Sequence, residues 1–297
     1  WMICSQFGIV VFLITMAYGD DSLVLWQFAA LLVAFFSATQ DLAIDAYKIE
    51  LLAKSDYGLG SAVSCVGYRL AMMLSGGGLL IVADFFGWRV CYLIAAGIVL
   101  MFILLSIFFP EKLLVKERQS FASKAAWLDL LSRNKACFWL LLILLYRFAD
   151  VVLVNFGGAF LLKHCGLSLT QVGIVYKIVG VGATIVGSVV AGLLLKKHTF
   201  NKLLLIGAVL QSLSFIPFVV ASVVTVDFVA INFIVGLESF ASGFAVTCLL
   251  ALIMDWCNES YLATQMAWLT AIVAIPRVLF GGVVGSIIDY FGWFDLF

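Results

Sequence analysis

The chain has 297 residues and no formal net charge; 65% of its residues are hydrophobic and 11% are charged. Soluble domains are about half apolar and about one quarter charged, so this composition excludes a water-soluble globule. Without an excess of positive charge, nothing indicates binding to nucleic acid. The composition favours an α-helical membrane protein, in which apolar runs of about 20 residues cross the lipid bilayer.

Apolar stretches of the length of a membrane span recur along the chain. In chain order they predict nine spans, near residues 1–18, 25–47, 58–83, 88–109, 136–162, 172–195, 203–222, 228–254 and 261–288, and the start of a tenth near Phe294. The first run begins at Trp1 without an initiator methionine, so we expect this chain to be a piece of a longer protein.

Basic residues give the predicted orientation of these spans, because cytoplasmic loops are rich in lysine and arginine. The loops on one side hold eleven basic residues: Lys48, Lys54, Lys112, Lys116, Arg118, Lys124, Arg133, Lys135, Lys196, Lys197 and Lys202. The loops on the other side hold only Arg89 and Lys163. We therefore expect the first set to be cytoplasmic and the loops near Asp84 and Asp289 to face outward.

An internal repeat indicates two equivalent halves. Gly76-Gly77 followed by Asp84-Phe85-Phe86-Gly87-Trp88 recurs as Gly281-Gly282 followed by Asp289-Tyr290-Phe291-Gly292-Trp293. Both copies close a span at its outward end, six spans apart and in the same direction, as in the two parallel six-helix bundles of a major facilitator transporter. This predicts an all-α membrane protein with an N-terminal bundle at 1–109, a cytoplasmic linker at 110–135 and a C-terminal bundle at 136–297. Two N-terminal spans and most of the last span would lie outside this chain.

Several phrases resemble the AmpG-type muropeptide permeases. They read Gln40-Asp41-Leu42-Ala43-Ile44-Asp45-Ala46-Tyr47-Lys48, Gly67-Tyr68-Arg69-Leu70, Tyr146-Arg147-Phe148-Ala149-Asp150, Tyr176-Lys177 and Cys257-Asn258-Glu259-Ser260. The resemblance covers essentially the whole chain. It implies a monomer in the bacterial inner membrane that imports anhydromuropeptides, which are small glycopeptides, for cell-wall recycling and β-lactamase induction. It also implies no cofactor, with protons as the coupling ion. Related acetyl-coenzyme A transporters approximate the first phrase, so acetyl-coenzyme A or another anionic solute remains the alternative substrate.

Ionisable residues within spans are costly in lipid and therefore indicate function. The candidate substrate-binding residues are Arg69, Tyr146, Arg147, Lys177 and Arg277. Arginine suits a carboxylate or a phosphate because its planar guanidinium donates two parallel hydrogen bonds. Tyr68, Tyr146 and Tyr176 each precede a cation, and an aromatic wall beside a cation suits a sugar ring. A structural ion pair between Arg147 and Asp150 is the alternative reading of that part of the site.

Four carboxylates are candidates for proton coupling: Asp41, Asp45, Asp150 and Glu238. Asp41, Asp45 and Lys48 share one helical face near the cytoplasmic end of their span. Asp45 and Lys48 form a candidate gate ion pair, whereas Asp41 lies deeper in the span and is the stronger candidate for a proton acceptor. Glu238 lies at mid-depth, where it is either a second proton site or, as we favour, the counter-ion of Arg277.

Catalytic and metal-binding constellations are not visible in the sequence. The two histidines, His164 and His198, lie in or near separate loops, and the seven cysteines lack metal-ligand spacing. We therefore expect neither an enzyme nor a metal site. A channel would also tolerate buried charge, but the parallel repeat favours a transporter that works by alternating access.

Overall fold

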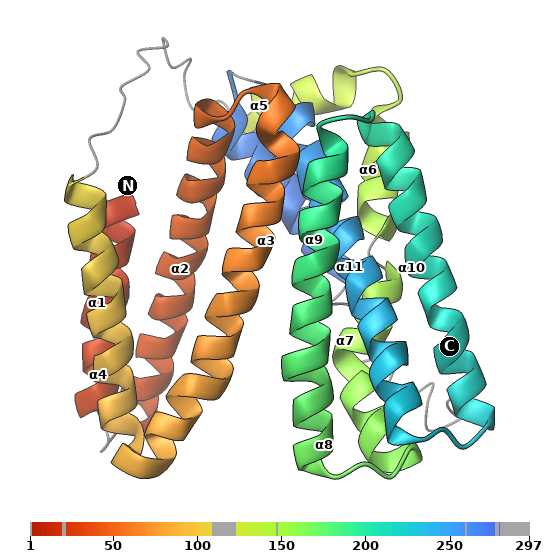
Figure 1. Ribbon diagram of the computed structural model, residues 1–297. Coiled ribbons are helices and arrows are strands. Elements are labelled where there is room, and N and C mark those ends of the chain that lie inside the picture. The colour runs from red at the N-terminus through yellow and green to blue at the C-terminus, as the bar shows by residue number, and fades with distance from the viewer. Residues whose placement is uncertain are drawn as a thin grey trace. The chain divides into compact units, whose positions relative to one another are not determined.

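The computed structural model describes residues 2–19, 22–108, 123–146, 148–258 and 260–276, together with Leu279. Within these ranges all regular elements are helices (Figure 1). A helix satisfies its backbone hydrogen bonds within one segment, which lipid requires because it offers no donors or acceptors. The predicted all-α class is confirmed.

The helices follow the predicted spans closely. They are α1 (Met2–Tyr18), α2 (Leu23–Leu51), α3 (Tyr57–Met73), α4 (Leu79–Phe108), α5 (Ser123–Ser132), α6 (Ala136–Tyr146), α7 (Phe148–Ala159), α8 (Leu169–Ile174), α9 (Val181–Leu195), α10 (Phe200–Val223) and α11 (Phe228–Trp256). A further apolar helix, Leu262–Pro276, follows α11. Its predicted continuation to residue 288 lies outside the described residues.

Five helical segments of the described chain are long and apolar enough to cross a membrane. They are Leu23–Leu51, Ile81–Phe108, Thr170–Leu195, Phe200–Val223 and Phe228–Trp256. The predicted spans at 136–162 and 172–195 are interrupted by the π-helical turns Phe160–His164 and Val175–Gly180. Single π-helical turns inside α-helices occur frequently at functional sites, so the second turn is considered below.

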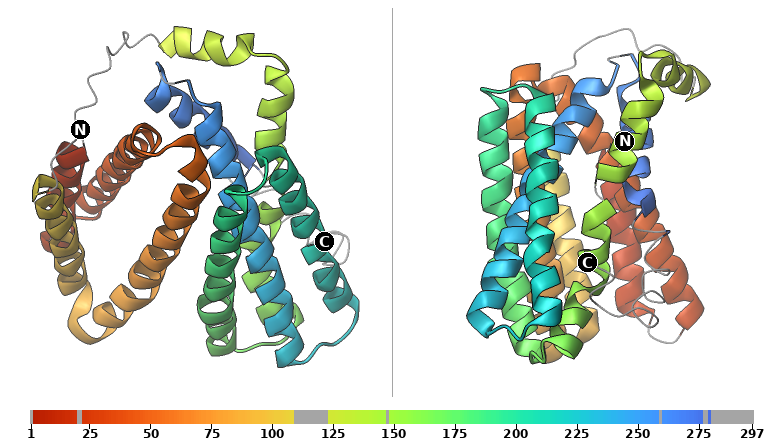
Figure 2. Two further views of the ribbon diagram at one scale, coloured as in Figure 1. Left: turned by 45° about the horizontal axis from the view of Figure 1, so that its top comes forward. Right: turned by 90° about the vertical axis from the view of Figure 1, so that its right-hand side faces the viewer.

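The described residues pack as two compact units, and the first takes those within 1–51 and 70–108. In this unit α1 packs against both α2 and α4 (Figure 2). Apolar side chains cover the outside of α2, where Leu31 is 67% exposed and Phe35 is 62% exposed. Such a surface is suited to lipid rather than to water.

The chain reverses direction within α4, at Gly87. This glycine has φ 81° and ψ 164°, a backbone conformation that L side chains rarely adopt but that glycine adopts without a steric penalty. The reversal separates the predicted spans at 58–83 and 88–109 (Figure 1). The neighbouring Phe85, Phe86 and Trp88 are exposed, as expected for residues at the membrane–water interface.

The second unit takes the described residues within 52–69 and 123–279, and α11 lies at its centre. Helix α11 packs against α9 and α10, and 78% of its apolar window is buried. Most of α3, from Tyr57 to Arg69, therefore groups with the helices that follow the predicted linker. Most of that linker lies outside the described residues, and the bundle boundaries at 109 and 136 stay a prediction.

Candidate substrate and proton sites

The predicted cations occupy different surroundings. Arg69 is half-buried on α3, whereas Lys177 is exposed in the π-helical turn Val175–Gly180. Arg147 and Arg277 lie outside the described residues. A shared anion-binding cavity lined by these cations therefore stays a prediction.

Tyr146 packs inside the second unit. Its hydroxyl donates a hydrogen bond to the backbone carbonyl of Leu204 on α10, at 2.9 Å. The ring packs against a buried cluster that includes Phe244 and Cys248. This placement favours a role in joining α6 to α10, and the predicted contact with substrate stays untested.

The predicted pair near the end of α2 is present. Lys48 Nζ lies 2.6 Å from Asp45 Oδ1, and both side chains are about one quarter exposed. Asp41 lies one turn away and is exposed. The pair is intrahelical, since the two residues are three positions apart, and its action as a gate stays a prediction.

Glu238 lies in the buried core of the second unit. It is 9% exposed, and its Oε2 accepts a hydrogen bond from the hydroxyl of Ser239 at 3.3 Å. The Tyr176 hydroxyl is buried, and the turn Val175–Gly180 that carries it packs against α11. A Cβ atom built on Gly180 would lie 3.2 Å from the Ser239 hydroxyl oxygen and 3.9 Å from Tyr176 Cδ1. The sequence places Tyr176 beside Lys177 but does not predict that Tyr176 lies near α11, the helix of Glu238. Asp150, the other mid-depth carboxylate, belongs to α7, and its side chain lies outside what the structure describes.

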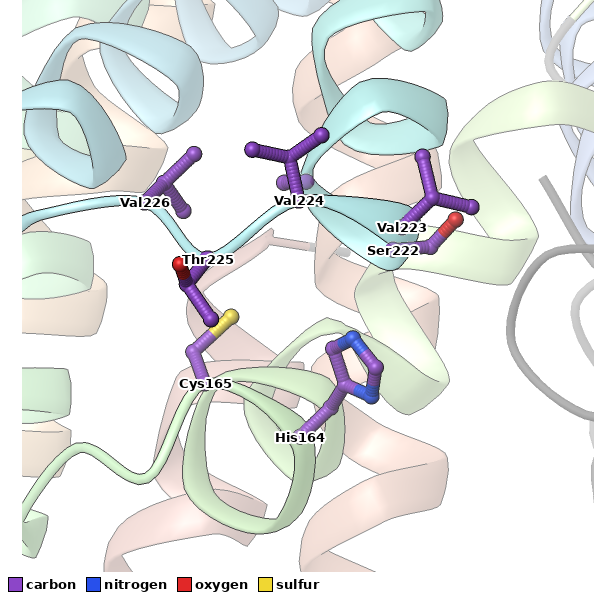
Figure 3. A pocket seen from close by; sticks show the side chains of 8 residues that line it. His164, Cys165, Ser222, Val223, Val224, Thr225 and Val226 are labelled. Atoms are coloured by element: carbon purple, nitrogen blue, oxygen red, sulfur yellow. The ribbon is translucent and has the colours of Figure 1, made fainter.

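A cavity of about 230 Å³ lies between the π-helical turn Phe160–His164 and the connection from α10 to α11 (Figure 3). Its walls are His164, which ends this π-helical turn, the following Cys165, and residues 221–226, which span the end of α10 and the start of its connection to α11. The His164 ring stacks on Phe160, with 5.1 Å between ring centroids. None of the residues predicted to bind substrate or protons lines this cavity.

A set of contacts that we call the latch joins the beginning of α3 to the ends of α9 and α11. Asp56 Oδ1 lies 3.3 Å from Lys196 Nζ, and Lys54 Nζ lies 4.0 Å from Asp255 Oδ1. Below these ion pairs, the Ser61 hydroxyl donates to the sulfur of Met254 at 3.4 Å.

Small residues let these helices approach at the latch. A Cβ atom built on Gly192 would lie 2.7 Å from Ala62 Cβ and 2.9 Å from the carbonyl oxygen of Gly58. The contacts lie at the end of the spans predicted to be cytoplasmic. The latch was not predicted from the sequence, although its lysines belong to the predicted cytoplasmic set.

A hydrogen-bonded network ties α5 to the turn after α11. Asp129 is its centre: its carboxylate accepts from Gln265 at 2.7 Å, from Arg133 at 2.6 Å and from Asn258 at 3.1 Å. Arg133 also donates to the carbonyl of Trp256. Desolvation by itself would raise the pKa of Asp129, but the hydrogen bonds from Gln265, Arg133 and Asn258 outweigh it and hold the pKa below its usual value.

This network predicts how the docking of α5 depends on pH. Because the pKa of Asp129 is lowered by folding, the carboxylate stabilises the docked helix fully above the ordinary aspartate pKa of about 3.9. The stabilisation is lost as the pH falls through the lowered pKa. Asp129→Ala leaves three donors without their acceptor, and we expect it to destabilise docking by about 1–3 kcal/mol at neutral pH. Hydrogen exchange of the amides of 123–132 measures the effect.

The matched control is Lys124→Ala on the same helix, because the Lys124 side chain is exposed. It is expected to leave exchange unchanged at neutral pH. Equal exchange rates in the Asp129 and Lys124 variants would contradict a docking role for Asp129.

In the described part of the chain, no three His, Cys, Asp or Glu side chains gather as a metal-binding group.

Comparison with known proteins supports the fold and identifies relatives of the chain. The chain is 33% identical over 299 residues to the anhydromuropeptide permease of Escherichia coli (strain K12); the alignment covers 99% of this chain and 61% of that protein. It is 27% identical over 309 residues to AmpG 4, a transporter of Rickettsia conorii, covering the whole chain and 74% of that relative.

Solved structures share the fold at low identity. The human organic anion transporter MFSD10 superposes with a TM-score of 0.76 at 17% identity, covering 99% of this chain and 72% of that one. An outward-facing bacterial homologue of the iron transporter ferroportin gives a TM-score of 0.69 at 15% identity, covering 99% and 76%. The family model of the Major Facilitator Superfamily matches residues 1–281. With its all-helical fold and its apolar spans, the chain belongs to the Major Facilitator Superfamily of membrane transporters.

Proposed function

We propose that this protein imports anhydromuropeptides across the bacterial inner membrane, driven by protons and by alternating access. The observation that carries the proposal is the 33% identity to an anhydromuropeptide permease along 99% of the chain. The chain spans 61% of the length of that permease, so substrate and coupling are proposed for the full-length gene product.

Alternating access requires a closure that forms in one state and breaks in another. The latch has the properties of such a closure. Its ion pairs are partly exposed, with Asp56 and Lys196 more than two fifths accessible, so each pair contributes little free energy and breaks at low cost. In the repeat interpretation α3 belongs to the N-terminal bundle and α9 and α11 to the C-terminal one, so opening the latch would open the cytoplasmic side.

Substrate recognition is assigned to the cations within the spans. Arg69, Arg147 and Arg277 supply planar donors for a carboxylate of the muropeptide, and Lys177 adds a fourth charge. Anionic groups in a low-dielectric site interact strongly with such donors. Proton coupling is assigned to Glu238, the carboxylate that the structure buries most deeply among those it describes, with Asp41 and Asp150 as further candidates.

Uptake by proteoliposomes tests this function. The full-length gene product is reconstituted, an inward proton gradient is imposed, and uptake of labelled anhydromuropeptide is compared with uptake of labelled acetyl-coenzyme A. We expect gradient-dependent accumulation of the muropeptide, which collapses when a protonophore removes the gradient. Uptake of acetyl-coenzyme A alone would reject the proposed substrate and favour the alternative. Muropeptide uptake that ignores the gradient would reject proton coupling.

A further inference from the structure

Two buried hydroxyl groups lie where the π-helical turn Val175–Gly180 packs against α11, the helix that carries Glu238. One is Ser239, 7% exposed, whose hydroxyl donates to the carboxylate at 3.3 Å. The other is Tyr176, whose hydroxyl oxygen is buried and has no hydrogen-bond partner among the described residues. A buried hydroxyl without a partner costs about 1–3 kcal/mol, so such a group in a native fold calls for a functional explanation.

The surrounding helices leave room for the Tyr176 hydroxyl at one particular place. A Cβ atom built on Gly157 of α7 would collide with the Tyr176 oxygen, so glycine at 157 admits the hydroxyl. Similarly, a Cβ atom on Gly180 would lie 3.2 Å from the hydroxyl oxygen of Ser239. Glycines therefore border both hydroxyl groups.

Tyr176 belongs to the π-helical turn Val175–Gly180, which changes the register of the span between α8 and α9. Val175, its neighbour, is completely buried in an apolar cluster with Leu153, Phe218 and Val235, and Tyr176 packs against this cluster. The low dielectric of these surroundings strengthens any interaction between the hydroxyl and a charged carboxylate. Single π-helical turns inside α-helices occur frequently at functional sites.

Among the side chains that the structure describes, few titratable groups surround this position. Glu238 comes from α11, and Cys165, which follows the π-helical turn Phe160–His164, packs against the same apolar cluster as Tyr176. Helix α9 carries no charged residue, and the charged residue of α10, Lys202, lies in its first turn. Lys177, in the same π-helical turn, is exposed, and Asp150 on α7 has a side chain outside the described part.

We propose that Tyr176 is a positioning residue for the coupling proton, whose hydroxyl donates a hydrogen bond to Glu238 when that carboxylate is charged. The inference rests on the proposed function, since it needs Glu238 to exchange a proton during transport. The phenol keeps its own proton throughout. When Glu238 accepts a proton, its oxygens become weaker acceptors, the hydrogen bond weakens, and the turn Val175–Gly180 is released.

The test is the pH profile of uptake for Tyr176→Phe in proteoliposomes of the full-length gene product. Loss of a hydrogen bond to the charged carboxylate favours its protonated form, so the pH of half-maximal uptake should move about one unit toward alkaline pH. The KM for substrate should stay unchanged. A merely structural role would lower the maximal rate or the amount of folded protein without moving this midpoint.

A second variant pair guards against a folding defect. Gly157→Ala pushes the Tyr176 hydroxyl away and should shift the midpoint in the same direction. Gly158→Ala is the matched control, because a Cβ atom there meets nothing within 4 Å, and it should not shift the midpoint. Equal midpoints for wild type, Tyr176→Phe and Gly157→Ala would overturn the inference, as would equal shifts in the Gly157 and Gly158 variants.

Glu238→Gln separates this inference from the proposed coupling. It should abolish the response to the proton gradient and leave substrate counterflow, and Tyr176→Phe added to it should cause no further shift. If Glu238→Gln keeps gradient-driven uptake, the coupling role of Glu238 is wrong and the inference falls with it. If Glu238→Gln loses coupling while Tyr176→Phe behaves as wild type, only the inference is wrong.

Discussion

Joining residue 56 to residue 196 with a reducible thiol cross-linker is expected to reduce uptake to that of empty liposomes. In the structure Asp56 and Lys196 form an ion pair at 3.3 Å, and both side chains are accessible to a reagent. The variant carries Asp56→Cys and Lys196→Cys. If transport requires the latch to open, a short covalent bridge holds the cytoplasmic side closed. Uptake is measured before treatment, after treatment and after reduction of the cross-linker. Reduction should restore uptake.

Controls for this experiment come from the chain itself. The single variants Asp56→Cys and Lys196→Cys, treated in the same way, report reaction at the exposed native cysteines Cys4 and Cys137. They should transport normally, because surface ion pairs of this kind contribute at most about 1 kcal/mol. Full uptake by a double variant that is shown by mass spectrometry to be bridged would refute opening at the latch.

Gly187→Leu is expected to prevent close packing of α9 on α11 and to lower the thermal stability of the protein strongly. A Cβ atom at position 187 would collide with the carbonyl oxygen of Phe240 and lie 3.1 Å from the backbone nitrogen of Phe244. These are backbone atoms, so a helix has to move rather than a side chain. Overpacking of a tight core costs about 1–3 kcal/mol, and a leucine at a backbone contact belongs at the upper end of that range.

Helix α11 also contributes a glycine to its contact with α9. A Cβ atom on Gly243 of α11 would collide with the carbonyl oxygen of Thr184, and the Ser188 hydroxyl donates to the carbonyl of Gly243 at 3.1 Å. Helices in lipid associate through such small residues and interhelical hydrogen bonds, because apolar surface gains little by leaving one apolar medium for another.

The matched control for Gly187→Leu is Gly182→Leu. Gly182 lies five residues earlier on α9, and a Cβ atom there meets nothing within 4 Å. The control should unfold at the wild-type temperature or above it, since glycine is about 0.8–1.0 kcal/mol less favourable in a helix than alanine, and leucine ranks just below alanine. Thermal unfolding in detergent measures both variants. Equal unfolding temperatures would show that the two helices do not rely on this contact.

Much of the fold was predictable from the sequence for a local reason. A membrane span must be apolar along about 20 residues whatever it packs against, so the runs that became α2, α10 and α11 are visible without tertiary information. The reversal at Gly87 and the ion pair between Asp45 and Lys48 are also local, since each involves residues within a few positions. The distribution of basic residues among the loops also predicts how the spans are oriented in the membrane.

The partners of the polar side chains were decided only by the tertiary structure. Helix α11 is apolar on nearly all its sides, so its sequence gives no preferred face for Glu238. The relative rotation of the packed helices places the turn that carries Tyr176 against α11. The same rotation turns Tyr146 toward Leu204, while Asp255 meets Lys54 through the approach of two distant helix ends. Hydropathy fixes where a helix crosses the bilayer, whereas side-chain contacts between helices depend on rotation and register, which close packing determines.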